Sequence, residues 1–377
     1  MAPSVTAFDE HMMAVALMMA RRGLGLAAPN PSVGAVIADE ASGELISRAV
    51  TAPGGRPHAE PLAIAAAGER ARGATIYVTL EPCSHFGKTP PCADAIIAAG
   101  MKRAVVAIED PDPRVAGRGL DRLRAAGIEV VRGVGAAEAR WIARGHIVRV
   151  TERRPLVTLK LALDADGNVP RGGGGKPLFV TSAQTRAHAH VLRAMNEAIL
   201  VGSATVRDDD PALTCRLPGL EARSPLRVVL ARTLSLPPEA KTFAQDAPGS
   251  ALVVTASGSE PETVAALKEH GVEVDEVPAV AGRIWLPAVM ETLVARGITR
   301  LIVEGGPTIW RAFANHALCD EVTLYVAGAH AAGVGSRQAL SYAQRWLGRL
   351  PLTLVAERRL GPDTLFRLRF DHPGKGS

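Results

Sequence analysis

The sequence predicts an α/β protein built from two domains. Its 377 residues exceed the usual size of one domain, and 47% of them are hydrophobic, enough for two sizeable cores. Short apolar runs alternate with alanine-rich stretches of helical length, which is typical of a parallel or mixed sheet covered by helices. The polar, basic stretch 144–155 ends in proline and is interpreted as a linker, so we expect domains at 1–147 and 148–377.

The first domain is expected to begin with an amphipathic helix at 8–22, with Asp9 as its N-cap and Gly23 as its stop. The methionines of this helix are interpreted as core residues. Strands and helices should then alternate, with strands at 35–39, 74–80, 103–108 and 128–131, and helices at 58–70, 92–100 and 117–126.

The second domain repeats the α/β pattern with a core of its own. Its expected strands are 156–163, 197–203, 226–231, 251–256, 271–277, 300–306 and 321–328. Its expected helices are 182–194, 262–269, 286–296 and 307–317, and a turn is expected at 208–211.

Composition excludes several classes of function. The net charge of +5 is scattered rather than massed in runs, and the 4% aromatic content is a poor supply for stacking single-stranded nucleic acid. Four cysteines in a chain of this length indicate a reducing compartment and a metal or catalytic use. The apolar run 12–20 lacks a basic segment before it and is too short to cross a bilayer. We therefore expect a cytoplasmic protein that binds neither nucleic acid nor membrane.

One His, one Glu and two Cys are placed to gather around a metal ion. His58 and Glu60 open a helix, Cys83 follows a strand, and Cys92 opens the next helix, where the backbone favours thiolate. Three protein ligands leave one tetrahedral position for water, as in catalytic zinc sites, and Glu60 would then be the proton shuttle. The pattern His-x-Glu with Pro-Cys pairs is typical of zinc deaminases. A structural zinc site or a chance cluster of core cysteines is the alternative.

Longer motifs resemble the bifunctional deaminase/reductase family of riboflavin biosynthesis. The deaminase-like segments are NPSVGAVI (30–37), HAE (58–60), TLEPCSHFGKTPPCADAI (79–96) and EDPDPRVAGRGLDRLRAAGIEV (109–130). The reductase-like segments are EAILVGSATVRDDDPALTCR (197–216) and LIVEGGPTIWRAF (301–313). The resemblance runs from about residue 10 to 365. It implies a cytidine-deaminase-like three-layer domain followed by a dihydrofolate-reductase-like α/β domain.

The resemblance also implies two consecutive reactions. The deaminase domain would remove ammonia from 2,5-diamino-6-(5-phosphoribosylamino)pyrimidin-4(3H)-one with one Zn2+ per chain. The reductase domain would then use NADPH to reduce the ribosyl group of 5-amino-6-(5-phosphoribosylamino)uracil to ribityl. Small phosphorylated pyrimidines are thus the expected partners. Homo-oligomers are compatible with this class, but the residue pattern fixes no number.

For the deaminase domain the resemblance assigns His58, Cys83 and Cys92 to zinc and Glu60 to proton transfer. The expected substrate contacts are Asn30, His85, Lys88 and Thr89. A lysine and a hydroxyl in the loop suit a phosphate or a polar base edge. A solvated loop tip is the alternative for His85 and Lys88.

For the reductase domain the resemblance assigns substrate contacts to Arg193, Ala212, Arg216 and Glu304. The expected cofactor contacts are Phe179, Thr205, Asp209, Gly305, Gly306, Pro307 and Thr308. Two glycines ahead of a helix that starts at a proline also suit the pyrophosphate of a dinucleotide, because free N–H groups point at the ligand. A tight helix entry without a ligand is the alternative.

The reductase half departs from the family in LDADGNVPRGGGGKPLFVTS (163–182). Asp164 stands where serine is usual, Asn168 replaces a basic residue, and Leu178 or Phe179 replaces a tryptophan. The strand at 226–231 also ends in Ala-Arg where aspartate is common. These departures leave open a deaminase with a degenerate reductase domain. A nucleic-acid deaminase is disfavoured by the composition.

Overall fold

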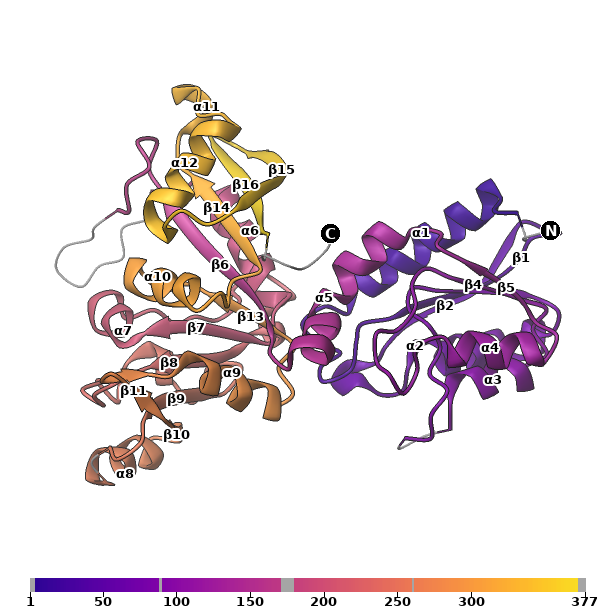
Figure 1. Cartoon of the computed structure of the whole chain (residues 1–377), viewed down its shortest axis with the longest axis horizontal. Helices are drawn as coiled ribbons and strands as arrows, with labels where there is room; N and C mark the ends of the chain where they lie inside the picture. Colours follow the sequence, from indigo (N-terminus) through magenta and orange to yellow (C-terminus); the bar gives the residue numbers. More distant parts are fainter. Residues whose placement is uncertain (1–3, 88–89, 171–179, 260, 372–377) are drawn as a thin grey trace. The chain divides into compact units, whose positions relative to one another are not determined.

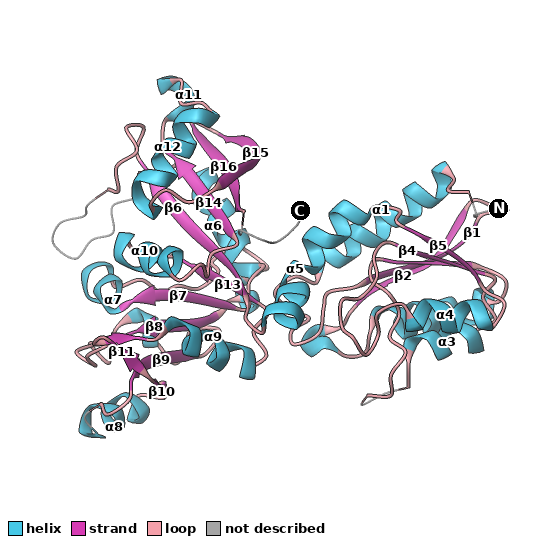
Figure 2. Ribbon diagram, viewed as in Figure 1, coloured by secondary structure: helices cyan, strands magenta, loops and turns pink. Residues whose placement is uncertain are grey.

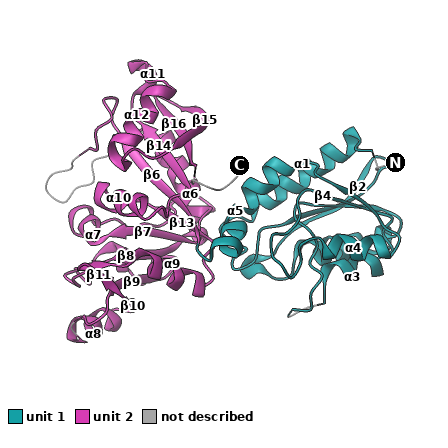
Figure 3. Cartoon of the chain, viewed as in Figure 1, with its two compact units in different colours: residues 1–154 teal, residues 155–377 magenta. Residues whose placement is uncertain are grey.

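The computed structural model describes residues 4–87, 90–170, 180–259 and 261–371. The chain divides into two compact units, Met1–Arg154 and Pro155–Ser377, each with its own sheet (Figure 3). Among these described residues, no helix combines the length and the apolar character needed to cross a membrane.

The first unit is a five-stranded mixed sheet with the strand order β2-β1-β3-β4-β5. Strand β1 runs antiparallel to β2 and β3, whereas β3, β4 and β5 are parallel. Helices α1 and α5 lie on one face and α2, α3 and α4 on the other, which gives three layers (Figures 1 and 2). The strands are β1 Gly34–Asp39, β2 Glu44–Val50, β3 Thr75–Val78, β4 Arg103–Val106 and β5 Glu129–Arg132. The helices are α1 Ala7–Arg22, α2 Ala59–Ala67, α3 Cys92–Ala98, α4 Arg118–Ala125 and α5 Ala136–Glu152.

Two expectations for this unit are wrong. Thr6, not Asp9, is the N-cap of α1. Asp9 is the third helical residue, and its carboxylate accepts a hydrogen bond from the Thr6 backbone N–H, which completes a capping box. The expected linker 144–155 is largely helical, because α5 continues to Glu152 and buries Ile142, Gly145 and Val148 between its arginines. The expected boundary at 147/148 falls inside this helix.

The Asp9 carboxylate also holds the sheet to α1. Arg103 on β4 donates to its two oxygens at 2.6 and 2.8 Å, and the Tyr77 hydroxyl on β3 donates at 3.0 Å. Burial raises the pKa of Asp9, but the Arg103 and Thr6 hydrogen bonds outweigh burial and leave the pKa below its usual value. A residue that caps the helix thus also fixes the helix against two strands.

The second unit contains a nine-stranded sheet with the order β10-β9-β8-β7-β13-β6-β14-β16-β15. From β10 to β14 along this spatial order, each pair of neighbouring strands is parallel. Strands β16 and β15 form a hairpin and extend the sheet in antiparallel fashion. The strands are β6 Leu156–Leu163, β7 Ala198–Gly202, β8 Leu226–Leu230, β9 Ala251–Ala256, β10 Glu273–Val277, β13 Arg300–Val303, β14 Glu321–Val326, β15 Leu352–Leu360 and β16 Asp363–Phe370, and the short β11 Ala279–Val280 pairs with β12 Arg283–Ile284.

Helices follow most of these parallel strands. They are α6 Ala183–Ala194, α7 Ser203–Asp209, α8 Pro261–Glu269, α9 Leu286–Ala295, α10 Pro307–Asn315, α11 Ala329–Ala332 and α12 Ser336–Leu347. The 3-10 turns are Pro53–Gly55, Gly68–Ala71, Glu221–Arg223 and Lys241–Phe243. The expected turn at 208–211 begins within α7, which continues to Asp209. Because β7 and β13 are parallel neighbours, the segments after them, which open α7 and α10, share one edge of the sheet.

Candidate active sites

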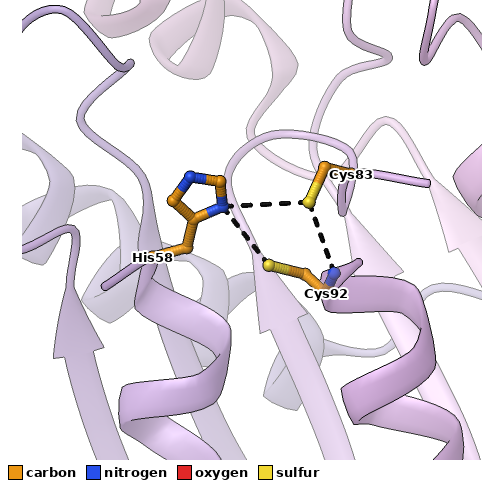
Figure 4. Close-up of side chains that lie close together, drawn as sticks. All are labelled: His58, Cys83 and Cys92. Carbon is orange, nitrogen blue, oxygen red and sulfur yellow. Dashed lines mark hydrogen bonds between the residues drawn. The ribbon is translucent and has the colours of Figure 1, made fainter. Parts of the chain in front are cut away.

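Three predicted metal-binding side chains converge in the first unit (Figure 4). His58 is the N-cap of α2, Cys92 is the first residue of α3, and Cys83 lies in the loop after β3. His58 Nδ1 lies 3.3 Å from Cys92 Sγ and 3.8 Å from Cys83 Sγ. The three donor atoms all lie within 4.8 Å of one another. One imidazole and two sulfurs at this separation fit a tetrahedral zinc ion with an open position.

The loop between the cysteines closes on itself at its two ends. The backbone N–H of Cys92 donates to Cys83 Sγ at 3.3 Å, and that of Ala93 donates to the Cys83 carbonyl at 3.2 Å. Hydrogen bonding with the Cys92 side chain is the largest cause that lowers the pKa of Cys83 to about 4, and the backbone N–H of Cys92 lowers it further. The interaction between the two side chains, followed by burial, raises the pKa of Cys92. Although eight residues separate the two cysteines, these hydrogen bonds hold their side chains together.

Glu60 and Asn30 both lie near His58. Glu60 is in the first turn of α2, is 3% exposed, and has its pKa raised to about 7 by burial. Asn30 donates through Nδ2 to the Gly55 carbonyl at 2.7 Å, and the same atom lies 3.3 Å from His58 Nε2. A buried carboxyl with a raised pKa beside three candidate metal ligands has the character of a proton carrier.

The loop residues expected to bind substrate are described in part. His85 has a buried Nδ1 that makes no hydrogen bond within the described part of the chain. Lys88 and Thr89 lie outside the described residues. Arg56, which the sequence reasoning missed, approaches this loop: a Cβ at Gly87 would lie 3.5 Å from Arg56 Nη2. The sequence feature that could have identified it is a basic residue two positions before the HAE motif.

Glu81, in the TLEPC motif, has a structural task. Its carboxylate accepts backbone N–H bonds from Asp110, Gly117 and Gly119 at 2.9 to 3.2 Å. A Cβ at Gly119 would lie 2.1 Å from the Pro82 carbonyl, so only glycine fits there. The EDPDPRVAGRG segment is thereby fastened beside the strand end that leads to Cys83.

In the second unit an ion pair lies at the carboxyl end of β13. Arg193 of α6 donates through Nε and Nη2 to the two Glu304 oxygens at 2.9 and 2.8 Å, and Lys160 Nζ of β6 lies 3.6 Å from the same carboxylate. The Glu304 side chain is 6% exposed. Burial raises its pKa, but Arg193 and Lys160 outweigh burial and bring the pKa to about 2.

Further basic groups extend this cluster. The backbone N–H of Arg216 donates to His190 Nδ1 at 3.3 Å, and Arg193 Nη1 donates to the Thr214 carbonyl at 2.9 Å. Burial, followed by the charges of Arg193 and Arg216, lowers the pKa of His190 to about 4. Lys160, Arg193 and Arg216 thus oppose a single carboxylate, an excess of positive charge that suits a phosphate. Lys160 was not identified from the sequence as a site residue. The feature that could have identified it is the presence of a lysine within the apolar strand LVTLKLAL.

The predicted cofactor contacts flank the ends of β7 and β13. Thr205 and Asp209 lie on α7, Gly305 and Gly306 link β13 to α10, and α10 begins at Pro307, followed by Thr308. A Cβ at Gly305 would lie 2.9 Å from Ile309 Cβ, so the helix packs closely on its own entry loop. Ala212 lies in the segment between α7 and Thr214. Phe179 lies outside the described residues.

Family comparisons match both halves of the chain. Residues 155–366 match the RibD C-terminal domain, and residues 6–108 match the cytidine and deoxycytidylate deaminase zinc-binding region. Riboflavin biosynthesis protein RibD of Aquifex aeolicus is 41% identical over 85% of this chain and 86% of its own length. The Escherichia coli protein of the same name is 38% identical over 96% and 99%.

Solved structures agree with this match. RibD of Acinetobacter baumannii has a TM-score of 0.80 at 32% identity, covering 97% of this chain and 99% of its own. A diaminohydroxyphosphoribosylaminopyrimidine deaminase/5-amino-6-(5-phosphoribosylamino)uracil reductase of Thermotoga maritima gives the same four values, 0.80, 32%, 97% and 99%. The predicted fold class, a deaminase-like domain followed by a dihydrofolate-reductase-like domain, is confirmed.

Proposed function

The chain belongs to the riboflavin biosynthesis protein RibD family, and on that premise we propose how its residues carry out the family's two reactions. It is a bifunctional enzyme with a zinc-dependent deaminase and an NADPH-dependent reductase. The proposed substrates are 2,5-diamino-6-(5-phosphoribosylamino)pyrimidin-4(3H)-one and then 5-amino-6-(5-phosphoribosylamino)uracil. The observation that carries the proposal is the convergence of His58, Cys83 and Cys92 beside the buried Glu60.

In the deaminase domain, His58 Nδ1 and the sulfurs of Cys83 and Cys92 would hold the zinc ion. When bound, zinc lowers the pKa of a water molecule towards about 7 and so supplies a nucleophile at neutral pH. The Glu60 carboxylate takes one proton from the attacking water and gives it to the pyrimidine ring nitrogen. It then takes the second proton from the hydroxyl that has been added to the ring and gives it to the amine, which leaves as ammonia. Asn30 and His85, with Lys88 and Thr89, position the phosphorylated pyrimidine.

In the reductase domain, Gly305, Gly306, Pro307 and Thr308 would hold the cofactor phosphates at the start of α10, with Thr205 and Asp209 alongside. When bound, NADPH supplies a hydride. Arg193, Arg216 and Lys160 attract the substrate phosphate, with Ala212 in the adjoining loop. Because Glu304 stays ionised, it accepts hydrogen bonds from the hydroxyls of the substrate.

A cytoplasmic location belongs to the same proposal. All four cysteines are free, as in a reducing compartment, and they lie among the described residues. Association into homo-oligomers, expected for this class of deaminase, is measured by size-exclusion chromatography with light scattering.

An assay of both activities tests the proposal. Purified protein should contain one zinc ion per chain and release ammonia from the diaminopyrimidine substrate. It should also oxidise NADPH when given the deaminated ribosylamino-uracil phosphate. Ammonia release without NADPH oxidation would contradict the reductase assignment and support a degenerate second domain.

A further inference from the structure

One hydrogen bond beside the reductase site has no part in the proposed mechanism. It joins the imidazole of His190 on α6 to the backbone of Arg216, whose N–H donates to His190 Nδ1 at 3.3 Å. His190 is half-buried, whereas Arg216 is exposed. Because Arg216 is a proposed contact of the substrate phosphate, a group that fixes its backbone affects how that phosphate is bound.

The three residues that end in Arg216 are fastened to one side of α6. His190 and Arg193 are one helical turn apart and therefore lie on the same side of the helix. Arg193 Nη1 donates to the Thr214 carbonyl at 2.9 Å, and the Cys215 thiol donates to the His190 carbonyl at 3.5 Å. Each of the three successive residues thus makes a hydrogen bond with this turn of α6.

The charges around His190 keep its imidazole in the form that accepts the hydrogen bond. Burial, followed by the charges of Arg193 and Arg216, lowers the pKa of His190 to about 4, so the ring is neutral at pH 7. A neutral imidazole has one N–H donor and one acceptor, and because Nδ1 accepts here, the proton lies on Nε2. A cationic ring would place a second N–H against that of Arg216 and lose the bond. The cations that suit a phosphate therefore also keep His190 in its accepting form.

We propose that His190 is a positioning residue of the reductase: by accepting the Arg216 N–H, it fixes the backbone from which the Arg216 guanidinium reaches the substrate phosphate. The inference rests on the proposed function of the second unit and on the assignment of Arg216 to that phosphate. An arginine loses conformational entropy when it binds a ligand, and a backbone that is already fixed reduces this loss. His190 therefore acts on the affinity for the phosphorylated substrate and not on hydride transfer.

Two substitutions separate the acceptor at Nδ1 from the rest of the imidazole. Asparagine places its amide oxygen close to the position of Nδ1, so His190→Asn keeps an acceptor for the Arg216 N–H. Glutamine places its amide closer to the position of Nε2, so His190→Gln keeps a polar side chain but removes that acceptor. The hydrogen bond from the Cys215 N–H to Ser224 Oγ, at 3.0 Å, continues to hold the segment in both variants.

The matched control is His270→Gln. His270 is an exposed histidine of the same unit, and its Nδ1 lies 2.9 Å from the Ala266 carbonyl, one turn earlier in the chain. This variant also removes a histidine that contacts the backbone through Nδ1, but it does so away from the segment that ends in Arg216.

Calorimetric titration of the full chain with ribose 5-phosphate and with ribose isolates the contribution of the phosphate. We expect His190→Gln to weaken ribose 5-phosphate binding roughly five- to tenfold, the effect of about one hydrogen bond, and His190→Asn to stay within roughly twofold of the unaltered chain. Arg216→Ala should remove most of the difference between the two ligands. Adding His190→Gln to Arg216→Ala should weaken binding no further, because both residues act on one contact.

Steady-state kinetics give an independent measurement. With 5-amino-6-(5-phosphoribosylamino)uracil at saturating NADPH, His190→Gln should raise KM and leave kcat unchanged, and His190→Asn should restore KM. A residue that only supports the fold would show no such separation of KM from kcat and no rescue by asparagine.

The outcomes separate this inference from the proposed function. If His190→Gln and His190→Asn weaken ribose 5-phosphate binding equally, or neither does, the positioning role is wrong and the reductase activity stands. An effect of His190→Gln that persists in full in Arg216→Ala, or an equal loss in His270→Gln, would also overturn it. If the unaltered chain does not oxidise NADPH, the reductase assignment is wrong, and the calorimetric comparison alone decides the role of His190.

Discussion

The two catalytic domains each contain a buried glutamate next to candidate substrate-binding groups, and the two carboxyls have opposite character. Glu60 is 3% exposed, and burial raises its pKa to about 7. The Glu304 side chain is 6% exposed, yet Arg193 and Lys160 overcome burial and hold its pKa at about 2. Burial alone therefore does not determine what a carboxyl does. The number of cations that reach it decides whether it exchanges protons or remains a fixed charge.

This difference matches the two reactions. Hydrolytic deamination moves protons between water, ring and ammonia, so it needs a carboxyl that changes state near neutral pH. Reduction of a phosphorylated sugar needs a stable anion among cations to orient a charged substrate. In the proposed mechanism Glu60 is the proton carrier and Glu304 is the fixed charge.

The largest expected effect comes from removing the titrating carboxyl. Glu60→Gln preserves the shape of the side chain but removes its ability to accept and donate the proton. The rate of ammonia release should therefore fall by roughly 10²- to 10⁴-fold. Zinc content, measured by mass spectrometry, should stay at one ion per chain, and NADPH oxidation should be unchanged. Glu69→Gln, an exposed residue just after the same helix, is the control. Ammonia release at the unaltered rate would exclude Glu60 as the proton carrier.

The second prediction concerns the ion pair between Arg193 and Glu304. In Arg193→Met, the Glu304 carboxylate, whose side chain is only 6% exposed, loses its bidentate partner. This loss should lower the free energy of unfolding by about 3–5 kcal/mol. Urea denaturation followed by tryptophan fluorescence reports mainly on this domain, because Trp285, Trp310 and Trp346 lie in it and only Trp141 lies in the other.

The control for this variant is Arg186→Met, an exposed arginine on the same helix. Adding Glu304→Leu to Arg193→Met should restore much of the lost stability, since the buried carboxylate that lost its bidentate partner is then removed. An equal loss for Arg193→Met and Arg186→Met would show that the ion pair contributes nothing.

The smallest expected effect is a pH dependence. The folded pKa of Glu304, about 2, lies below its usual 4.5, so its stabilisation is fully present above 4.5 and is lost as pH falls towards 2. The reductase domain should therefore lose up to about 3 kcal/mol more than Glu304→Gln does between pH 5 and 2. Urea midpoints measured across this pH range test it. Parallel pH profiles for the two proteins would contradict a depressed pKa.

The sequence predicted most strands of both sheets because their interiors are continuous apolar runs such as LVTLKLAL and ALVVTA. It missed β2 and β15, whose residues are largely exposed, and β16, in which Arg367 and Arg369 interrupt the apolar residues. It also missed α12 and the whole of α5, in which arginines separate the buried positions. Periodicity finds elements with one clear apolar face, and it fails where charges interrupt that face.

The candidate sites were predictable to different degrees. His58, Cys83 and Cys92 could be grouped because metal-binding residue types are rare and their positions at element ends are informative. The approach of Lys160 to Glu304 could not be predicted, because it depends on β6 and β13 lying side by side in a particular register. Arg56 near the loop at Gly87 likewise depends on the path of the chain before His58.

The shared partners of the Asp9 carboxylate have a consequence for which substitutions the domain tolerates. It serves the Thr6 cap, the Arg103 guanidinium and the Tyr77 hydroxyl at once. Replacing any one of these partners leaves the others with a buried polar group that has lost its match, so the cost of each change depends on which of the others are present. We therefore expect substitutions in this corner of the deaminase domain to be tolerated in compensating pairs better than singly, although it lies outside the proposed reaction site.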